Sequence, residues 1–303
     1  MESTKEYTLL NGVKMPYIGL GTFQMESKDS IVHAVEKEGY RHIDTAWVYN
    51  TEHLVGEALE EVFAKGVIKR EDIFVVTKIH PRQFMEAEQT LKESLSRLKL
   101  DYVDCFLLHW PAQFQLPEKR VPLHVIWKQL EEFVDQGLIK SLGLSNFNVQ
   151  LTADLLTYAR HKPVINQVEL HPFNCQVELV RFLLDHHILP VAYCPLGRPT
   201  PVEEESKPEN LKYFKVPELR LDERVKEMAQ KYNKSEFQVI LRYGLDRGYG
   251  IIPKANKPEH QKQNIDIFDF HLSQEEIEYL NSKNINFRIC NKFQFLKEYD
   301  IFA

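Results

Sequence analysis

Eight short apolar runs alternate with longer amphipathic stretches, and this alternation limits the possible folds more than any other feature of the sequence. The short runs are typical of strands. The longer stretches carry apolar residues at three- and four-residue spacing, which indicates helices that bury one face. Strands that alternate with helices are joined by crossovers and are therefore parallel. The predicted strands are residues 18–21, 42–44, 74–78, 103–109, 140–145, 164–169, 189–193 and 250–253.

The predicted helices include residues 30–38, 52–64, 87–98, 123–136 and 177–186. Asp29, Ser235 and Ser273 stand where N-cap residues would precede helices, and Gly39 and Gly137 stand where helices would stop. Eight such units in 303 residues favour a closed (β/α)8 TIM barrel of the α/β class over an open, doubly wound sheet. We therefore expect residues 1–303 to form a single barrel domain.

Three segments do not fit the repeat. Residues 7–17 carry Asn11-Gly12 between apolar residues, which predicts a β-hairpin with a two-residue turn ahead of the barrel. Residues 112–121 and 197–217 contain prolines and polar residues and predict long loops at the carboxyl-terminal face of the barrel. Residues 286–303 predict either a third loop over that face or a tail.

Composition argues against several classes of protein. The net charge is −6 and the basic residues are scattered, so we expect no nucleic-acid partner. No apolar stretch is long enough to span a membrane, and residues 1–20 lack the apolar run of a signal peptide. The four cysteines form no CxxC pair and no metal-ligand spacing with histidine. We therefore expect a cytoplasmic protein with reduced thiols and no bound metal.

A polar residue closes each of the eight predicted strands. In barrels of this type, functional side chains come from the carboxyl ends of the strands, which converge on one mouth. A single polar strand end is ordinary solvation, but eight of them predict a functional site. These residues are Thr22, Asp44, Lys78, His109, Ser145 with Asn146, Asn166 with Gln167, Tyr193, and Lys254.

Four residues suggest a chemistry. A buried Lys78 would need a carboxylate partner, and Asp44 ends the neighbouring strand. Tyr49 follows five residues later, and a cation beside its phenol would make it a better proton donor. His109 could orient a substrate carbonyl. Each residue also has a purely structural interpretation. Asp44 and Lys78 could be an ion pair without function, Tyr49 an aromatic residue at the rim, and His109 a hydrogen-bonded histidine of the core.

At these residues the chain resembles the aldo-keto reductase family. The resemblance rests on the order and spacing of short motifs, and it maps that family's catalytic tetrad onto Asp44, Tyr49, Lys78 and His109. The motifs are Gly19-Leu20-Gly21-Thr22, Arg41-His42-Ile43-Asp44-Thr45-Ala46, Thr77-Lys78, Leu108-His109-Trp110-Pro111, Gly143-Leu144-Ser145-Asn146-Phe147, Asn166-Gln167, Tyr193 with Pro195-Leu196-Gly197, and Ile252-Pro253-Lys254.

The resemblance implies that NADPH binds across the barrel mouth and passes a hydride to the carbonyl carbon of the substrate. It also implies that Tyr49 donates a proton to the carbonyl oxygen. It implies that Ser145, Asn146 and Gln167 hold the carboxamide, that Tyr193 stacks on the nicotinamide, and that Lys254 meets the 2′-phosphate. The full implied cofactor set is Gly21, Thr22, Phe23, Asp44, Ser145, Asn146, Gln167, Tyr193, Pro195, Leu196, Lys254, Ala255, Asn256, His260 and Asn264. The implied substrate pocket is Phe23, Trp47, Tyr49, His109 and Trp110.

Near the phosphate, the chain departs from the pattern of the better-studied animal members of that family. Ala255 replaces a serine, His260 replaces an arginine and Gln263 replaces a glutamate. Because a lost guanidinium removes a bidentate phosphate ligand, use of NADH is also open. The expected partner is a small carbonyl substrate such as an aldose, and the expected assembly is a monomer or weak dimer. The alternative function is a regulatory or structural barrel that keeps the cofactor site but turns over little.

Overall fold

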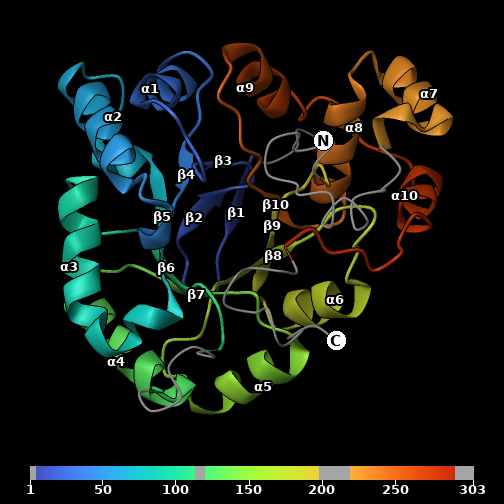
Figure 1. Cartoon of the computed structure of the whole chain (residues 1–303). Helices are drawn as coiled ribbons and strands as arrows, with labels where there is room; N and C mark the ends of the chain where they lie inside the picture. Colours follow the sequence, from blue (N-terminus) through green and yellow to red (C-terminus); the bar gives the residue numbers. More distant parts are fainter. Residues whose placement is uncertain (1–4, 113–119, 198–218, 291–303) are drawn as a thin grey trace, which may run out of the picture.

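The computed structural model describes residues 5–112, 120–197 and 219–290. Eight parallel strands, ordered as in the sequence, form a sheet surrounded by helices, which confirms the predicted (β/α)8 fold (Figure 1). The strands are β3 (Leu20–Gly21), β4 (His42–Asp44), β5 (Phe74–Ile79), β6 (Cys105–Leu108), β7 (Leu142–Ser145), β8 (Ile165–Glu169), β9 (Leu189–Tyr193) and β10 (Gly250–Ile251).

The sheet closes between its first and last strands. Ile18 forms a parallel bridge with Ile251, the N–H of Gly19 donates to the Ile251 carbonyl at 2.9 Å, and the N–H of Ile251 donates to Tyr17 at 2.8 Å. At Gly21, a Cβ atom would lie 2.9 Å from the carbonyl oxygen of Ile252. The close approach of β3 to β10 therefore explains why glycine stands at position 21.

The predicted helix boundaries agree closely with the structure. Two helices match to the residue, and those predicted at 123–136 and 177–186 each end one residue earlier. Ser235 and Ser273 are N-caps, as predicted, and the structure shows a complete capping box at each. The helices are α1 (Lys28–Glu36), α2 (Glu52–Ala64), α3 (Ala87–Leu98), α4 (Leu123–Asp135), α5 (Val149–Tyr158), α6 (Val177–Asp185), α7 (Glu223–Tyr232), α8 (Glu236–Asp246), α9 (Pro258–Ile265) and α10 (Gln274–Asn281).

The N-cap prediction for Asp29 is wrong. The cap of α1 is Ser27, whose Oγ accepts the backbone N–H of Asp29 at 3.0 Å. Asp29 lies in the first turn, where its negative charge interacts favourably with the positive end of the helix dipole. Helix α1 also ends at Glu36 rather than 38, and Gly39 follows at φ +77°. Gly137 follows the end of α4 at φ +78°, as the pattern indicated.

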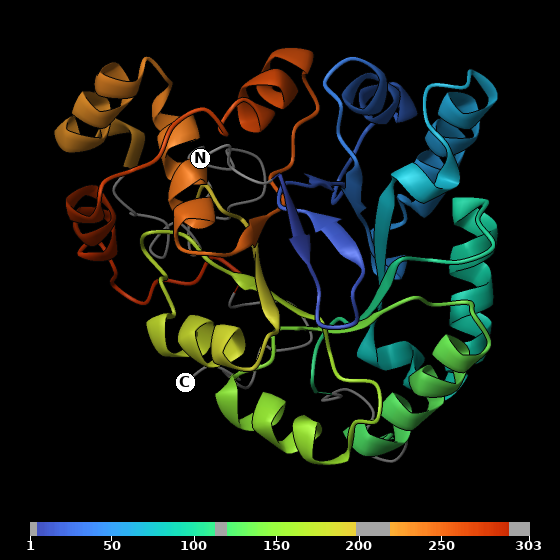
Figure 2. The same ribbon diagram turned by 180° about the vertical axis from the view of Figure 1, so that it is seen from behind.

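A hairpin of β1 (Glu6–Thr8) and β2 (Lys14–Pro16) lies across the amino-terminal end of the barrel (Figure 2). Its turn is longer than the predicted two residues. The N–H of Leu9 donates to Val13, that of Gly12 donates to Leu9, and Gly12 has φ +84°. These bonds leave three residues in the loop, with glycine in the left-handed position that such loops require. Asn11 then bonds Lys140 and Ser141 at the barrel floor.

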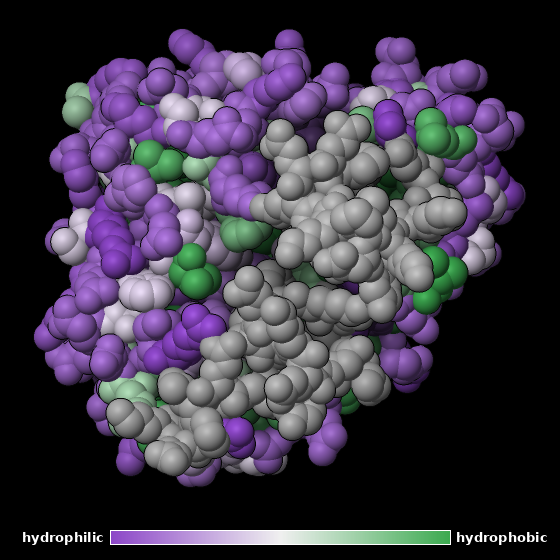
Figure 3. All heavy atoms as spheres, viewed as in Figure 1, coloured by the Kyte–Doolittle hydropathy of each residue, from purple (hydrophilic) through white to green (hydrophobic). Residues whose placement is uncertain are grey.

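Among the described residues, the two larger hydrophobic clusters lie inside the barrel and between the barrel and its helices. In β6, Cys105 and Leu107 point into the barrel, whereas Phe106 and Leu108 pack against the helices. Leu9 and Met15 of the hairpin join the interior cluster from below. On the described surface in Figure 3, polar residues dominate and hydrophobic side chains form separate spots. No helix within the described ranges is long and apolar enough to cross a membrane.

The predicted loops at 112–121 and 197–217, and residues 291–303 of the predicted terminal segment, fall almost entirely outside the described residues. Residues 286–290 are described and do run back to the barrel. Their backbone N–H groups reach the end of β8 and the loop after it, because Phe287 donates to the Phe173 carbonyl at 2.9 Å and Ile289 donates to Glu169 Oε1 at 2.6 Å.

His42 makes the stability of the fold depend on pH. Burial lowers its pKa to about 4, and its Nδ1 donates to the Pro16 carbonyl at 3.2 Å. Between about pH 6.5 and 4, the unfolded chain takes up a proton that folded His42 does not accept, so the free energy of unfolding falls as pH falls. We expect His42 to account for a loss of about 1 kcal/mol between pH 7 and 5.5.

Urea unfolding of the wild type, His42→Gln and His53→Gln over this pH range tests the prediction. The His42→Gln protein should show a shallower slope, by about one proton near pH 5. The exposed His53 serves as the control, and its substitution should leave the slope unchanged. A slope that is the same in wild type and His42→Gln would contradict this account.

Candidate active site

A layer of polar side chains caps the apolar interior of the barrel. In β5, Phe74 and Val76 belong to the interior cluster, and Lys78 continues the same face two residues later. Inward-facing polar residues also stand at the ends of four other strands, and in β8 and β9 they lie above apolar residues of the interior cluster. These residues are Asp44 in β4, Ser145 in β7, Gln167 and Glu169 in β8, and Tyr193 in β9.

Asp44 and Lys78 form the predicted ion pair. Lys78 Nζ lies 2.7 Å from Asp44 Oδ1, and the side chains are 0% and 2% exposed. Lys78 also donates to the Thr45 carbonyl at 2.8 Å, and Gln167 Nε2 donates to Asp44 Oδ2 at 2.6 Å. Burial lowers the pKa of Lys78, and the Asp44 carboxylate opposes that effect. Both oxygens of the buried carboxylate are therefore satisfied.

Tyr49 ends a short 3-10 helix, η1 (Trp47–Tyr49), in the loop after β4. Lys78 Nζ lies 5.0 Å from the centroid of its ring, which also meets Phe23 and His109 edge-on. Burial raises the pKa of Tyr49 well above its ordinary value, and the Asp44 carboxylate raises it further. The expectation of a more acidic phenol is therefore not met, because burial is the largest effect on the pKa of Tyr49.

His109 lies just beyond β6, and its backbone N–H donates to the Ile79 carbonyl at 3.0 Å. Its ring centroid is 5.5 Å from that of Tyr49 and 6.4 Å from that of Trp110. Burial, and then the charge of Lys78, hold the pKa of His109 well below its ordinary range. The ring is therefore neutral near pH 7. Its Nδ1 is buried without a hydrogen-bond partner among the residues described.

The residues predicted to line the substrate pocket surround Tyr49 on several sides. Phe23 packs against Tyr49 with ring centroids 5.0 Å apart and remains 42% exposed, whereas Trp110 is buried beside His109. Trp47 is anchored outward, since its Nε1 donates to Glu93 of α3 at 3.0 Å and Arg97 lies over its ring. The result is a partly apolar wall around a phenol and a neutral imidazole.

The side chains predicted to hold the nicotinamide form one hydrogen-bonded network. Tyr193 donates from its hydroxyl to Asn146 Oδ1 at 2.8 Å, which fixes the half-buried ring at the mouth. Asn146 Nδ2 donates to Ser145 Oγ and to the His109 carbonyl, and Ser145 Oγ donates to the Gln167 carbonyl. Because Gln167 also bonds Asp44, this network joins the ion pair.

The residues predicted near the 2′-phosphate surround the start of α9. Lys254 and His260 are exposed, and Lys254 Nζ donates to the Gln24 carbonyl at 2.7 Å. Asn256 Nδ2 donates to Glu26, while its Oδ1 is buried without a partner among the described residues. Ala255 and Asn264 are buried. A helix N-terminus beside the Lys254 ammonium suits an anionic group.

Two residues near the site were missed from the sequence. His80 lies next to His109 with ring centroids 6.2 Å apart, and burial lowers its pKa to about 4. Glu169, at the end of β8, accepts His171 Nε2 at 2.9 Å and the N–H groups of Ile289 and Cys290 at 2.6 and 2.8 Å. A carboxylate that closes an apolar run was a signal in the sequence, but its distant backbone partners were not.

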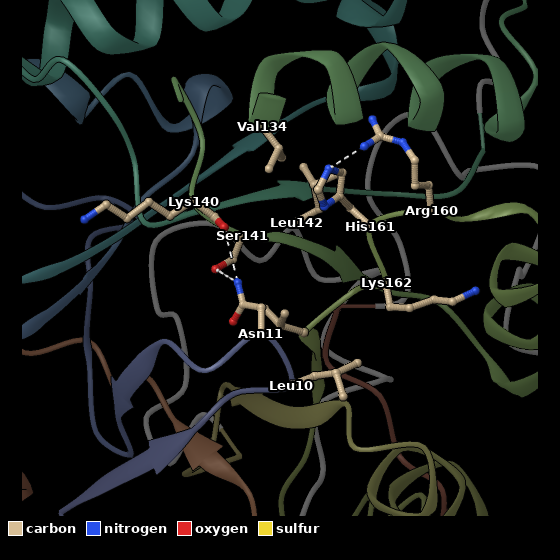
Figure 4. Close-up of a pocket in the computed structure, with 10 residues that line it drawn as sticks. Leu10, Asn11, Val134, Lys140, Ser141, Leu142, Arg160, His161 and Lys162 are labelled. Atoms are coloured by element: carbon tan, nitrogen blue, oxygen red, sulfur yellow. Dashed lines mark hydrogen bonds between the residues drawn. The ribbon is translucent and has the colours of Figure 1, made fainter. Parts of the chain in front are cut away.

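A hollow of about 230 Å³ lies at the opposite end of the barrel, lined by the hairpin turn and by residues just before β7 and β8. Figure 4 shows Lys140, Arg160 and Lys162 directed away from it. It therefore lacks the converging charges of a binding site. No group of three or more histidine, cysteine or acidic side chains within the described ranges is arranged to hold a metal ion.

Comparison with known proteins places this geometry in one family. The model of the Aldo/keto reductase family matches residues 9–285. A Danio rerio protein named aldo-keto reductase family 1 member A1-A is 40% identical, over 94% of this chain and 91% of that protein. Aldose reductase B of Dictyostelium discoideum is 38% identical, over 93% of each chain.

Solved structures agree with the sequence comparison. A Bombyx mori aldo-keto reductase in complex with NADP superimposes with a TM-score of 0.87 at 34% identity, and the match covers 97% of each chain. An aldo-keto reductase complexed with NADPH gives a TM-score of 0.88 at 30% identity, and the match covers 100% of this chain and 94% of the other. The chain belongs to the aldo/keto reductase family.

Proposed function

We propose that this protein reduces aldehydes and ketones, aldoses among them, to alcohols with NADPH, and that Tyr49 supplies the proton. The observation that carries the proposal is the packing of Tyr49 against neutral His109 and over the buried Lys78–Asp44 pair. The relatives named above are reductases, and one structural neighbour holds NADP. The alternative of a regulatory barrel gains no support from them.

The cofactor site would run from the nicotinamide network to the start of α9. Ser145, Asn146 and Gln167 would hold the carboxamide, and Tyr193 offers a ring already fixed by its bond to Asn146. Lys254 and His260 would meet the 2′-phosphate. The unpartnered, buried Asn256 Oδ1 and the N–H groups at the start of α9 supply polar contacts that suit this part of the cofactor. When bound, NADPH supplies the hydride.

The remaining cofactor contacts are proposals of the same kind. Gly21, Thr22 and Phe23 lie at the end of β3, and Thr22 Oγ1 donates to the Asp44 carbonyl at 3.0 Å. Pro195 and Leu196 follow β9 in a turn closed by a bond from the Gly197 N–H to the Cys194 carbonyl. Both turns border the mouth that the polar layer defines.

The proton step follows from the electrostatics of the site. Because the pKa of Tyr49 is raised by burial, the phenol remains protonated near pH 7 and can donate to a carbonyl oxygen. As the proton leaves, negative charge develops on the phenol, and the Lys78 ammonium 5.0 Å from the ring centroid offsets that charge. Neutral His109 is placed to position the carbonyl without competing as an acid.

We further propose that residues 1–303 form one domain that works in the cytoplasm as a monomer or weak dimer. The closed barrel, against which the hairpin and residues 286–290 pack, supports a single domain. Size-exclusion chromatography with light scattering measures the assembly. The proposed partner is a small carbonyl compound.

Replacing Tyr49 by phenylalanine should remove turnover while the cofactor still binds. The ring and its packing remain, but the proton is lost, so the rate should fall by about a hundred- to ten-thousandfold. The measurement is NADPH oxidation with a simple aromatic aldehyde, together with NADPH binding by fluorescence.

Tyr193→Phe is the matched control, because it also removes one hydroxyl but at the stacking position. It should weaken cofactor binding through loss of the Asn146 bond and leave a larger share of turnover. Near-wild-type turnover in Tyr49→Phe would exclude Tyr49 as the acid. A wild type that binds NADPH but reduces no aldehyde or ketone would instead favour the regulatory alternative.

Replacing His260 by arginine should raise the preference for NADPH over NADH. His260 is an exposed residue in the first turn of α9, and a guanidinium there would add a permanent, bidentate phosphate donor. The measurement is the ratio of kcat/KM for the two cofactors. Gln274→Arg, which adds the same charge on α10, should leave the ratio unchanged. An unchanged ratio in His260→Arg would show that this residue does not face the phosphate.

A further inference from the structure

A pair of cysteines lies at the mouth of the barrel, outside the residues assigned to the reaction. The Sγ atoms of Cys194 and Cys290 are 4.0 Å apart, although the residues are separated by 96 positions in the sequence. Both are half-buried, whereas Cys105 and Cys175 are buried. The two thiols at the mouth are therefore the more accessible to a small oxidant.

The backbone around each cysteine fixes the pair. Cys290 donates its N–H to Glu169 Oε2 at 2.8 Å, and Ile289 donates to Oε1 at 2.6 Å. Glu169 stands opposite Tyr193 in the register of β8 and β9, and Cys194 is the next residue. The carboxylate that holds Cys290 therefore sits beside the strand end that carries Cys194. Arg288 Nη2, which donates to Gln176 at 2.7 Å, ties the same segment a second time.

We infer that Cys194 and Cys290 form a reversible disulfide when the protein meets a peroxide, and that this bond lowers carbonyl reduction. A disulfide bond is about 2.05 Å long, so the two sulfurs must approach by roughly 2 Å. The thiol of Cys290 can move without breaking the bonds to Glu169, because those bonds involve only the backbone N–H groups of Ile289 and Cys290.

The chemistry balances with hydrogen peroxide as the oxidant. The thiolate of one cysteine attacks a peroxide oxygen, the O–O bond breaks, and a sulfenic acid forms as hydroxide leaves and takes up a proton to become water. The second thiolate then attacks the sulfenic sulfur, so that the S–S bond forms and the S–O bond breaks. The departing oxygen leaves as a second water. Two thiols lose two electrons, and one peroxide gains them.

The effect on turnover rests on the proposed function. The disulfide would join the end of β9, with Tyr193 and the Pro195-Leu196 turn, to the terminal segment at Cys290. Cys194 has φ +48°, a left-handed conformation that non-glycine residues adopt at a cost, so this turn is sensitive to an added constraint. We expect weaker NADPH binding and a several-fold fall in aldehyde reduction.

The test begins with a count of thiols, which does not depend on any activity. Purified wild type treated with hydrogen peroxide should lose two of its four thiols, and peptide mapping should find Cys194 joined to Cys290. Dithiothreitol should restore both thiols. Cys194→Ser and Cys290→Ser should form no such disulfide, whereas Cys105→Ala, which changes a buried interior residue, should still lose two thiols.

The second measurement compares each protein with its own untreated state. In the wild type, peroxide should weaken NADPH binding and slow aldehyde reduction several-fold, and a thiol reductant should reverse both effects. In Cys194→Ser, peroxide should change neither NADPH binding nor the rate. The inference fails if no disulfide joins the two residues, if Cys194→Ser is inhibited to the same extent, or if the oxidised wild type binds NADPH and turns over normally. A protein that reduces no aldehyde would contradict the proposed function, yet it would still show the disulfide and the weaker NADPH binding.

Discussion

The site depends on a single buried ion pair. Taking the Lys78 ammonium and the Asp44 carboxylate out of water is costly unless their hydrogen bonds are satisfied, and the barrel supplies those bonds from several strands. The lysine reaches Thr45, and the carboxylate receives Gln167 from across the barrel. The pair thereby joins β4, β5 and β8 at the top of the apolar interior. The rest of the polar layer is arranged around it.

The low-dielectric surroundings of this pair determine the protonation of its neighbours. Burial raises the pKa of Tyr49 and lowers that of His109, so the phenol keeps its proton and the imidazole stays neutral near pH 7. A donor and a neutral orienting group are thus available together without any change of pH. The cation beneath them becomes important when charge develops on the phenol. The burial that makes the hydrogen bonds of the ion pair necessary therefore also determines the protonation states needed for the proposed chemistry.

The sequence was sufficient for the barrel and for the ion pair because both follow from local patterns. Strand and helix periods predict the units, and a lysine at the end of an apolar strand requires a carboxylate nearby. The Ser27 cap and the three-residue hairpin loop were missed, since neighbouring residues compete for a cap and turn length depends on pairing. The acidity of Tyr49 was misjudged, because the sequence does not reveal how far the phenol is desolvated or where the ammonium directs its hydrogen bonds.

Long-range contacts formed the other limit. Nothing in the order of residues links Glu169 to the N–H groups at 289 and 290, or brings Cys194 to Cys290. These contacts join strand ends to residues more than ninety positions away in the sequence, and they depend on how the chain between α10 and residue 290 runs back to the barrel (Figure 1). The roles given to His260 and Asn256 likewise rest on the placement of α9.

The most direct test of the central claim is the aldehyde-reduction rate of Lys78→Met, measured together with NADPH binding and urea unfolding. Methionine keeps an apolar stem but removes the ammonium, and loss of one buried partner can cost about 3–5 kcal/mol of stability. Asp44→Asn/Lys78→Met removes both charges and relieves that cost, and Lys140→Met at the far end of the barrel is the control. We predict that Lys78→Met and Asp44→Asn/Lys78→Met, where folded, bind NADPH but reduce aldehyde at least about a hundredfold more slowly than the wild type. A folded Lys78→Met protein that turns over at the wild-type rate would contradict the account.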